Sequence, residues 1–321
     1  MKKLNAFICS CLATLLTLTA FGCANTNTSN DQTENVFSVN FIDVCYGDFT
    51  LITFKDGKNI LIDCGNDTEV SKQNVKNCLN DNDVSHIDYL ILTNVLSTKI
   101  GGALTVLENF SVGCAFIPDV LNKNLFPQFK DVYDKLVEND VLIKYSTNYQ
   151  TIIGEDYNLM FLSPKDKYDM NGSYIDFNTS LSPTIEQICN ISPIIYMQYK
   201  THRFLFTGDD LSSQEQTVLT NYNLNLYNND KLPLGKISLD DIDVYKASYH
   251  CSDKANCQEF LNLLRPKNVV ISTSASNGVG TYALQRIVAS NISCNIFRTD
   301  VVGNVCVVET DGALKISTSY L

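Results

Sequence analysis

Residues 93–102 read Thr-Asn-Val-Leu-Ser-Thr-Lys-Ile-Gly-Gly and follow directly on the apolar run 89–92, Tyr-Leu-Ile-Leu. An apolar run that ends in a polar loop with paired glycines predicts a buried strand and a tight connection. Outward from this loop, apolar runs alternate with segments of helical spacing. That order predicts an α/β fold with two sheets covered by helices. Periodicity alone does not separate one layered α/β architecture from another.

The expected elements follow from the spacing of apolar residues. Ser212 is expected to begin a helix with Glu215 closing a capping box, and residues 164–190 are expected to form a surface loop. Helices are further expected at 70–79, 101–109, 125–138 and 259–264. Strands are expected at 37–43, 49–54, 59–62, 87–93, 112–117, 141–145, 157–162, 194–199, 203–207, 244–248 and 269–272, with β structure again over 295–317.

Four further motifs flank the 93–102 loop in chain order. They are 41–48 (Phe-Ile-Asp-Val-Cys-Tyr-Gly-Asp), 60–65 (Ile-Leu-Ile-Asp-Cys-Gly), 206–209 (Phe-Thr-Gly-Asp) and 246–252 (Lys-Ala-Ser-Tyr-His-Cys-Ser). Together the five resemble the metallo-β-lactamase fold, in particular the hydrolase-like C-terminal domain of ComEC competence proteins. The resemblance covers residues 37–321 and implies an αββα four-layer sandwich.

The resemblance also shows what this chain lacks. In the family, the strand before the loop ends in Thr-His-x-His-x-Asp-His-x-Gly-Gly, and the His and Asp side chains bind zinc. The framing Thr93, Gly101 and Gly102 are present here, but the ligand positions hold Asn94, Leu96, Thr98 and Lys99. The resemblance therefore implies a scaffold that has lost its metal chemistry at this loop.

A zinc hydrolase needs three good ligands and an open position for water. By the same matching, the ligand-type survivors are Asp209 and His250, and Asp63 remains as an orienting carboxylate. His86 and His202 are expected to be ordinary surface residues. We therefore expect no metal and no other cofactor, with Asp209 and His250 as residual ligand candidates. Zinc is expected only if a metal site has been rebuilt.

Loss of the metal would leave Asp63 and Asp209 converging without a counter-charge. Two such charges ~4 Å apart repel by about 4 kcal/mol at an effective dielectric constant of ~20. One hypothesis is that the Lys99 ammonium replaces the charge of the metal and pairs with one of these carboxylates. The alternative is that Lys99 points to solvent. The candidate catalytic or binding residues are Asp63, Asp209, His250 and Lys99.

The chain has 12 cysteines, nine of them after the N-terminal segment. Three of the nine, Cys45, Cys64 and Cys251, stand where the family has glycine. They could form a disulfide, could join His250 and Asp209 in a thiolate metal site, or could be substitutions without a function. The last interpretation is favoured, because scattered cysteines usually behave as small buried hydrophobes.

The N-terminus has the pattern of an export signal. Lys2 and Lys3 precede an apolar stretch that ends before Cys23, and a polar tract follows. This resembles a bacterial lipoprotein signal, so we expect a signal peptide at 1–22, lipidation of Cys23, a flexible linker at 23–36 and a domain at 37–321. The mature protein would then be exported and anchored to the extracytoplasmic face of the cell membrane.

Charge and motifs together narrow the function. The net charge of −11 and the absence of a Lys/Arg cluster disfavour a nucleic-acid partner. The favoured hypothesis is a surface-anchored pseudoenzyme that has lost its dinuclear zinc site and binds an unidentified ligand or protein partner. The alternative is an active hydrolase, of phosphodiesterase or nuclease type, with a rebuilt metal site and a link to DNA uptake. That link rests on family analogy alone.

Overall fold

The computed structural model describes residues 36–120, 122–164, 183–227 and 235–320. By backbone contacts the chain separates into Met1–Glu34 and the compact unit Asn35–Leu321, which contains all the described residues. The predicted signal at 1–22, Cys23 and all but the last residue of the linker 23–36 lie outside the described residues. Among the described helices, none has both the length and the apolar character needed to cross a bilayer.

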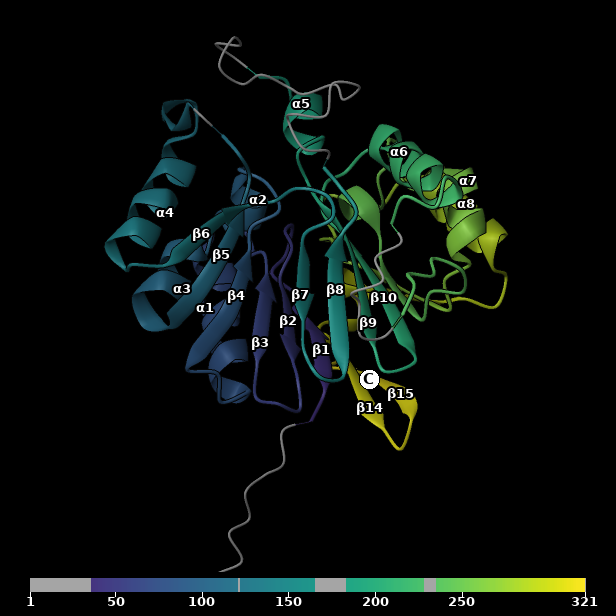
Figure 1. Ribbon diagram of the computed structural model, residues 1–321, viewed down its shortest axis with the longest axis horizontal. Coiled ribbons are helices and arrows are strands. Elements are labelled where there is room, and N and C mark those ends of the chain that lie inside the picture. Colours follow the sequence, from purple (N-terminus) through teal and green to yellow (C-terminus); the bar gives the residue numbers. More distant parts are fainter. Residues whose placement is uncertain (1–35, 121, 165–182, 228–234, 321) are drawn as a thin grey trace, which may run out of the picture. The chain divides into compact units, whose positions relative to one another are not determined.

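Two mixed β-sheets form the centre of the compact unit (Figure 1). The strands are β1 (Ser38–Phe41), β2 (Thr50–Thr53), β3 (Asn59–Ile62), β4 (His86–Ile91), β5 (Ser111–Ile117), β6 (Leu142–Tyr145), β7 (Thr151–Ile153), β8 (Tyr157–Phe161), β9 (Ile194–Tyr199), β10 (His202–Thr207), β11 (Val244–Lys246), β12 (Asn268–Ile271), β13 (Asn295–Arg298), β14 (Val305–Thr310) and β15 (Ala313–Thr318). One sheet has the order β15-β14-β1-β2-β3-β4-β5-β6 and the other β13-β12-β11-β10-β9-β8-β7.

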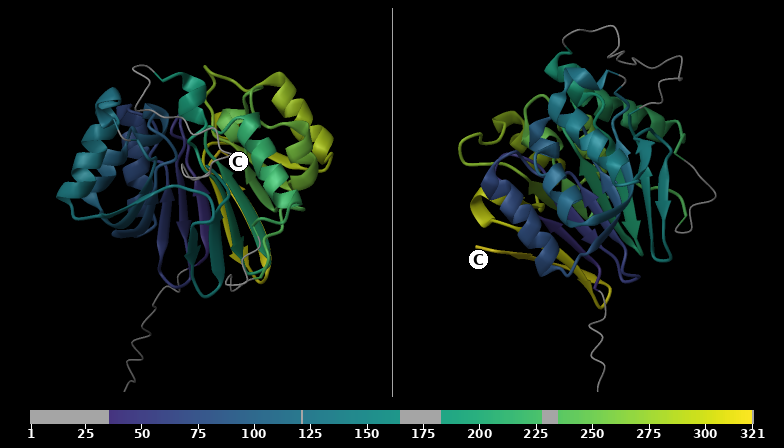
Figure 2. Two further views of the ribbon diagram at one scale, coloured as in Figure 1. Left: turned by 45° about the horizontal axis from the view of Figure 1, so that its top comes forward. Right: turned by 90° about the vertical axis from the view of Figure 1, so that its left-hand side faces the viewer.

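Helices connect the parallel strands and cover the outer faces of both sheets (Figures 1 and 2). The helices are α1 (Glu69–Asp81), α2 (Ser97–Ile100), α3 (Ala103–Asn109), η1 (Lys123–Leu125), α4 (Pro127–Glu138), α5 (Ile185–Cys189), α6 (Ser212–Asn223), η2 (Ser248–Cys251), α7 (Gln258–Leu264), α8 (Thr281–Ser290) and α9 (Thr299–Val302). Residues of α1, α3 and α4 pack on the first sheet, and residues of α6, α7 and α8 pack on the second.

Strand alternation divides the apolar residues between the layers. On β3, Leu61 faces the helices, whereas its neighbours Ile60 and Ile62 enter the core between the two sheets. Successive side chains of a strand point to opposite faces, so a strand buried on both sides reads as one apolar run. This is why the 59–62 and 87–93 segments lack polar alternation. The predicted αββα four-layer sandwich is confirmed.

The predicted strands and helices are largely confirmed, and the differences lie mainly in short elements, among them the unexpected α2, η1 and η2. Residues 164–190 were expected to be a loop throughout, but α5 forms within them behind a capping box at Thr184. The expected β structure over 295–317 is interrupted by the short helix α9, and neither β7 nor α8 was expected. Short elements at sheet edges carry little periodicity, and α8 begins beside a glycine-rich stretch that reads as a loop.

The predicted capping box at the start of α6 is wrong. Ser212 is the first helical residue and donates its hydroxyl to the Lys254 carbonyl, and the N-cap position falls on Leu211. Glu215 is fully buried and accepts the backbone N–H groups of Asn256 and Cys257, at 2.6 and 2.7 Å. The Glu215 carboxylate therefore bonds to a distant segment of the chain and does not cap the start of α6.

A Glu215→Gln variant should lose about 1–2 kcal/mol of unfolding free energy. The amide offers one acceptor oxygen for two buried N–H donors, and an unsatisfied buried donor costs about that much. Urea unfolding of the two proteins measures the difference. Ser212→Ala, which removes the exposed hydroxyl of the mispredicted cap, should cost less than Glu215→Gln; the reverse order would support the capping role.

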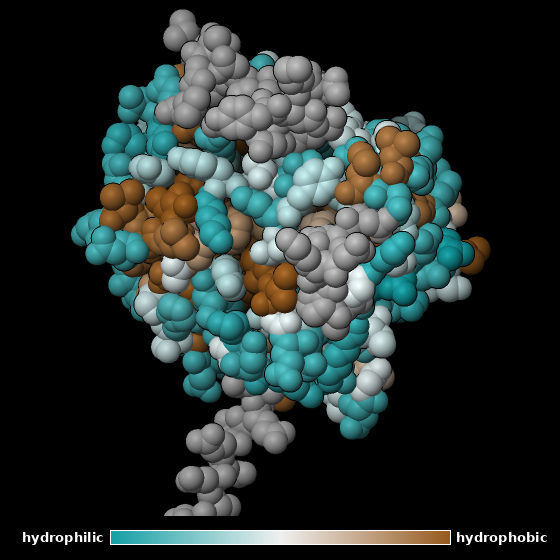
Figure 3. Space-filling view, viewed as in Figure 1, coloured by the Kyte–Doolittle hydropathy of each residue, from teal (hydrophilic) through white to brown (hydrophobic). Residues whose placement is uncertain are grey.

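The face of the molecule seen in Figure 3 is mainly hydrophilic, with separate apolar patches. Val137 of α4, Leu142 of β6 and Ile153 of β7 are about half exposed. Both β6 and β7 are the last strands of their sheets. Short edge strands limit unwanted pairing with other chains, and both strands are short here.

Candidate functional site

The candidate site lies where the parallel strands of both sheets end. Asp63 follows β3, residues 93–102 follow β4, Asp209 follows β10, and His250 lies in η2 after β11. Loops at the carboxyl ends of parallel strands are the usual place for a site in such folds. The order of the strands therefore brings together motifs that are far apart in the sequence.

The glycine pair holds the 93–102 loop in close contact with the loop after β3. A Cβ atom on Gly101 would lie 2.1 Å from the Asn66 carbonyl carbon, and one on Gly102 would lie 2.4 Å from the Cys64 oxygen. Side chains cannot be accommodated at such distances. The close approach fixes α2, and α2 directs Lys99 inward, where its side chain is fully buried.

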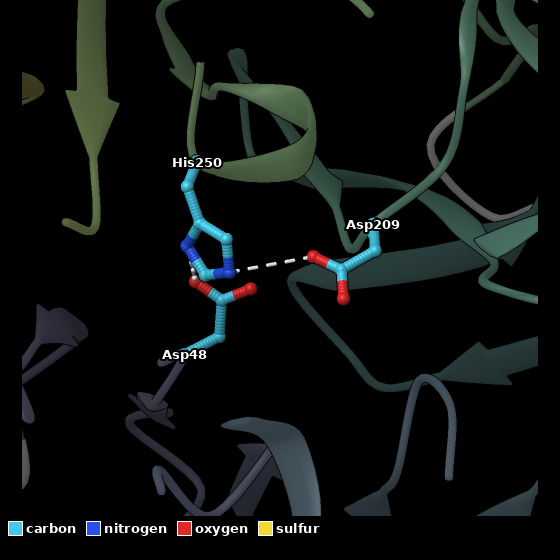
Figure 4. A group of neighbouring side chains, drawn as sticks. All are labelled: Asp48, Asp209 and His250. Carbon is cyan, nitrogen blue, oxygen red and sulfur yellow. Dashed lines mark ion pairs between the residues drawn. The ribbon is translucent and has the colours of Figure 1, made fainter. Parts of the chain in front are cut away.

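The ammonium of Lys99 lies among three ionisable side chains. It contacts Asp48, and its Nζ atom lies 2.7 Å from Asp209 Oδ1 and 3.1 Å from His250 Nε2. Figure 4 shows Asp48, Asp209 and His250 pointing toward one another from three different segments. The Lys99 amine occupies the space that they enclose, so it does not point to solvent.

The charge states at this centre follow from the neighbours. Burial lowers the pKa of Lys99, but Asp209 and Asp48 outweigh it and hold that pKa above its ordinary value. Burial likewise raises the pKa of Asp48, but Lys246 and Lys99 outweigh it and hold that pKa well below its usual range. The lysine is therefore a permanent cation here, and Asp48 is a permanent anion.

His250 is oriented as an uncharged acceptor. Its Nδ1 atom lies 2.8 Å from the Ser272 carbonyl, which can only accept, so Nδ1 carries the proton and Nε2 accepts from Lys99. Burial first and the Lys99 charge second lower the pKa of His250. The ring of Tyr46 packs over it with centroids 4.4 Å apart. This imidazole is consequently held neutral and has no free nitrogen to act as a base.

Lys246 extends the network beyond the lysine centre. Its ammonium lies 2.9 Å from Asp48 Oδ1 and 3.1 Å from the Thr207 carbonyl. Asp48 thus bridges two buried lysines. Neither Asp48 nor Lys246 was among the candidates identified from sequence. Both lie inside the quoted motifs 41–48 and 246–252. A charged residue next to a buried strand was the sequence feature that could have identified them as site residues.

Asp63 follows β3 and contacts the 93–102 loop. Its two oxygens accept the backbone N–H and the hydroxyl of Thr93, at 2.8 and 2.7 Å. Lys99 pairs with Asp209 rather than with Asp63. Burial raises the pKa of Asp63 to about 7, although Lys99 opposes that shift. Asp63, Asp48 and Lys246 line a cavity of about 10 Å³, which is enough for the centre of one water molecule.

The remaining ligand-loop positions have structural contacts. Asn94 donates its amide to Asp209 Oδ2 at 3.0 Å and to Ser192, and its oxygen accepts the Leu96 N–H. The backbone carbonyl of Thr98 accepts a hydrogen bond from the backbone N–H of Asp48. The Leu96 side chain packs on the helix-covered core of the first sheet. These residues therefore hold the carboxylates or the core through side-chain or backbone contacts.

The turn that carries His250 is strained. Tyr249, His250 and Cys251 have φ values of 46°, 53° and 61°, the left-handed region that costs roughly 1–2 kcal/mol for each non-glycine residue. The Asn256 side chain holds both ends of the turn in place, because it makes hydrogen bonds to the backbone of Ser248 and of Ser252. Ser248 also donates its hydroxyl to Asp210, whose pKa burial raises well above its usual range. Strain held by a fixed frame is typical of functional or formerly functional sites.

The three cysteines at family glycine positions are free thiols, which contradicts the disulfide alternative. Cys45 is exposed, whereas Cys64 and Cys251 are buried, and burial raises the pKa of Cys251 to about 12. Within the described residues, the group able to hold a metal consists of Asp48, Asp209 and His250 and includes no cysteine. The thiolate metal site is not assembled.

A Cys45→Gly variant should be more stable than the wild type by about 1 kcal/mol. Cys45 is exposed and has φ 62°, so glycine relieves left-handed strain without removing a buried contact. Thermal unfolding in a reducing buffer measures the gain. Cys64→Gly provides the contrast, because Cys64 is fully buried and its loss leaves a cavity; equal gains in both variants would contradict the explanation.

The residues present do not fit a metal ion beside Lys99. A zinc ion takes its nitrogen and oxygen ligands at about 2.0–2.2 Å, so an ion bound by Asp48, Asp209 and His250 would have to occupy the space of the Lys99 ammonium. That ammonium already lies 2.7 Å from Asp209 Oδ1 and 3.1 Å from His250 Nε2. No mechanistic step through a metal follows from this arrangement.

Comparison with solved structures shows a shared fold. The E377D mutant of the CmlA β-hydroxylase is 10% identical, with a TM-score of 0.51 over 86% of this chain and 54% of that chain. YhfI from Bacillus subtilis, described as a metallo-beta-lactamase fold protein, is 9% identical, with a TM-score of 0.47 over 88% of this chain and 100% of its own. A diphosphatase from the PhnP family is 11% identical, with a TM-score of 0.43 over 84% of this chain and 87% of its own.

This chain spans about half the length of the CmlA chain. No protein-family model matches it, and no curated protein does. At these identities the likeness concerns the fold alone, which this chain shares with the CmlA β-hydroxylase. The finer resemblance to ComEC domains stays a prediction.

Proposed function

We propose that this chain is a non-catalytic protein with the metallo-β-lactamase fold that acts by binding a ligand or partner at a membrane surface. The observation that carries the proposal is the position of the Lys99 ammonium among Asp48, Asp209 and His250. A covalently attached cation neutralises the carboxylates permanently. It cannot activate a water molecule in the way a bound metal does.

Two features of the site support a non-catalytic role over hydrolysis. The side chains that could act as acids or bases are already engaged: His250 lies between Lys99 and the Ser272 carbonyl, and Asp63 accepts two bonds from Thr93. The cavity at Asp63 and Lys246 admits no more than about one water molecule. The polar network thus serves to hold the two halves of the sandwich together.

Metal analysis with an activity assay tests the proposal. The full chain, purified with and without added zinc, is expected to contain far less than one equivalent of metal and to leave bis(p-nitrophenyl) phosphate intact. Stoichiometric zinc together with phosphodiesterase activity that Asp209→Ala abolishes would overturn the proposal. That result would favour the alternative, a hydrolase with a rebuilt site.

The proposed attachment to a membrane rests on the N-terminal segment. The proposal is that Cys23 is lipidated after removal of residues 1–22, which places the domain on the extracytoplasmic face. Expressed in a bacterium, the chain should incorporate labelled palmitate and partition into detergent. Cys23→Ser should abolish both, whereas Cys45→Ser, at an exposed cysteine of the compact unit, should not. Unchanged labelling of Cys23→Ser would exclude lipidation at this residue.

A further inference from the structure

We infer that the cavity beside the lysine centre is a binding site for one ordered water molecule that bridges Asp48, Asp63 and Lys246. Asp48 and Asp63 lie in loops of the first sheet, and Lys246 is the last residue of β11 in the second. The ligand is of the uncharged class that both donates and accepts hydrogen bonds. The site goes beyond the proposed function, because it concerns how the strand ends of the two sheets are joined.

The cavity has the size and the lining of a water site. Its volume of about 10 Å³ is close to the smallest that admits one water molecule. Ile62, Ile195 and Phe206 form apolar walls, and every residue around the cavity is buried. The polar wall consists of Asp48, Thr50, Asp63, Thr93, Thr207 and Lys246. Cavities lined by hydrocarbon alone stay dry, whereas several polar partners hold a water molecule in place.

One carboxylate oxygen at the cavity has no aligned donor. Asp48 Oδ2 contacts Lys99, which does not line the cavity, and Oδ1 lies on the side of Lys246. The Oδ1 atom lies 2.9 Å from the Lys246 ammonium, but no described residue gives it a hydrogen bond of good geometry. A buried charged oxygen without a donor costs more free energy than the immobilisation of one water molecule. A water molecule in the cavity therefore supplies the missing donor.

Lys246 and Asp63 provide the other partners. The ammonium of Lys246 has three N–H groups, and the Thr207 carbonyl accepts one of them at 3.1 Å. Each oxygen of Asp63 accepts one bond from Thr93, at 2.8 and 2.7 Å, and a carboxylate oxygen can accept a second. The water molecule thus has a donor in Lys246 and acceptors in Asp48 and Asp63. About three partners is the usual number for a buried water.

The charges around the cavity favour a neutral occupant over an ion. Lys246 repels a cation and Asp48 repels an anion, and their opposite charges compensate each other at 2.9 Å. Burial raises the pKa of Asp63 to about 7, so near neutral pH this carboxyl group is present both with and without its proton. Water accepts a hydrogen bond from the first form and donates one to the second. We therefore expect the water to stay bound in both.

The direct test is a crystal structure of the full chain at atomic resolution, determined on both sides of the Asp63 pKa of about 7. Each structure should show one solvent peak within hydrogen-bond distance of Lys246 Nζ, Asp48 Oδ1 and Asp63. A well-ordered cavity without density would overturn the inference. A peak with the short contacts of a metal ion would overturn it as well.

Oxygen-17 relaxation dispersion, which counts long-lived internal waters, gives a second test in solution. Asp63→Leu keeps nearly the shape of the side chain but cannot form hydrogen bonds, so it should lose one such water relative to wild type. The matched variant Asp63→Asn keeps a donor and an acceptor and should retain that water. Equal counts for Asp63→Leu and wild type would contradict the bridging role. If Asp63→Leu does not fold, the wild-type crystal structures decide.

Discussion

Replacing Lys99 by methionine is expected to lower the unfolding free energy by about 3–5 kcal/mol, the usual result of removing one partner from a buried ion pair. Methionine preserves most of the side-chain volume, so the loss reports charge rather than packing. Asp48 keeps Lys246 as its counter-ion, but Asp209 retains only the Asn94 amide and the buried His250 ring. Urea unfolding at neutral pH measures the effect.

Two further variants decide whether that loss arises at Asp209. Lys99→Met combined with Asp209→Asn should recover part of the stability, since the double variant no longer buries an unpaired carboxylate. Lys130→Met, which breaks the exposed Lys130–Asp134 pair on α4, should have no measurable effect. If Lys99→Met unfolds like the wild type, the ammonium is not an essential counter-charge.

Sequence reasoning was most successful where burial repeats along a strand or helix. The apolar runs 59–62 and 194–199 predict strands because two-sided burial leaves no polar face, and both are strands between layers. It was least successful for contacts between distant segments. The spacing Ser212 to Glu215 satisfies a local capping rule, but nothing in that spacing reveals that Asn256 and Cys257 would claim the carboxylate.

The same distinction applies to the site. The motif frame identified Asp209, His250 and Lys99, because each stands at a matched position next to a strand end. It left open whether Lys99 would pair with Asp63 or Asp209, and the structure pairs Lys99 with Asp209 while Asp63 bonds to Thr93. It also omitted Asp48, which joins both lysines. A linear motif gives the type and order of side chains, but the partner of a buried carboxylate depends on where two loops meet.

Asp63→Asn should change how stability depends on pH. Burial raises the folded-state pKa of Asp63 to about 7, above its ordinary value of 3.8, so folding favours the protonated carboxyl group. That stabilising contribution is complete below pH ~4 and is lost as the pH rises to ~7, at about 1.4 kcal/mol per pH unit. Across this window the loss amounts to roughly 4 kcal/mol. Above pH 7 the asparagine variant should be more stable than wild type, because it buries no ionised carboxylate.

Unfolding free energies of wild type and Asp63→Asn, measured from pH 4 to 8, test this prediction through their difference. The difference isolates Asp63 because Asp210 and Glu215, whose pKa values burial also raises, are present in both proteins. Thr93→Val gives an independent check of direction. It removes a hydroxyl that stabilises the charged form, so it should raise the Asp63 pKa and extend the decline in stability to higher pH. Parallel profiles for wild type and Asp63→Asn would mean that Asp63 is ionised throughout the range, which would require a closer cationic partner than Thr93 provides.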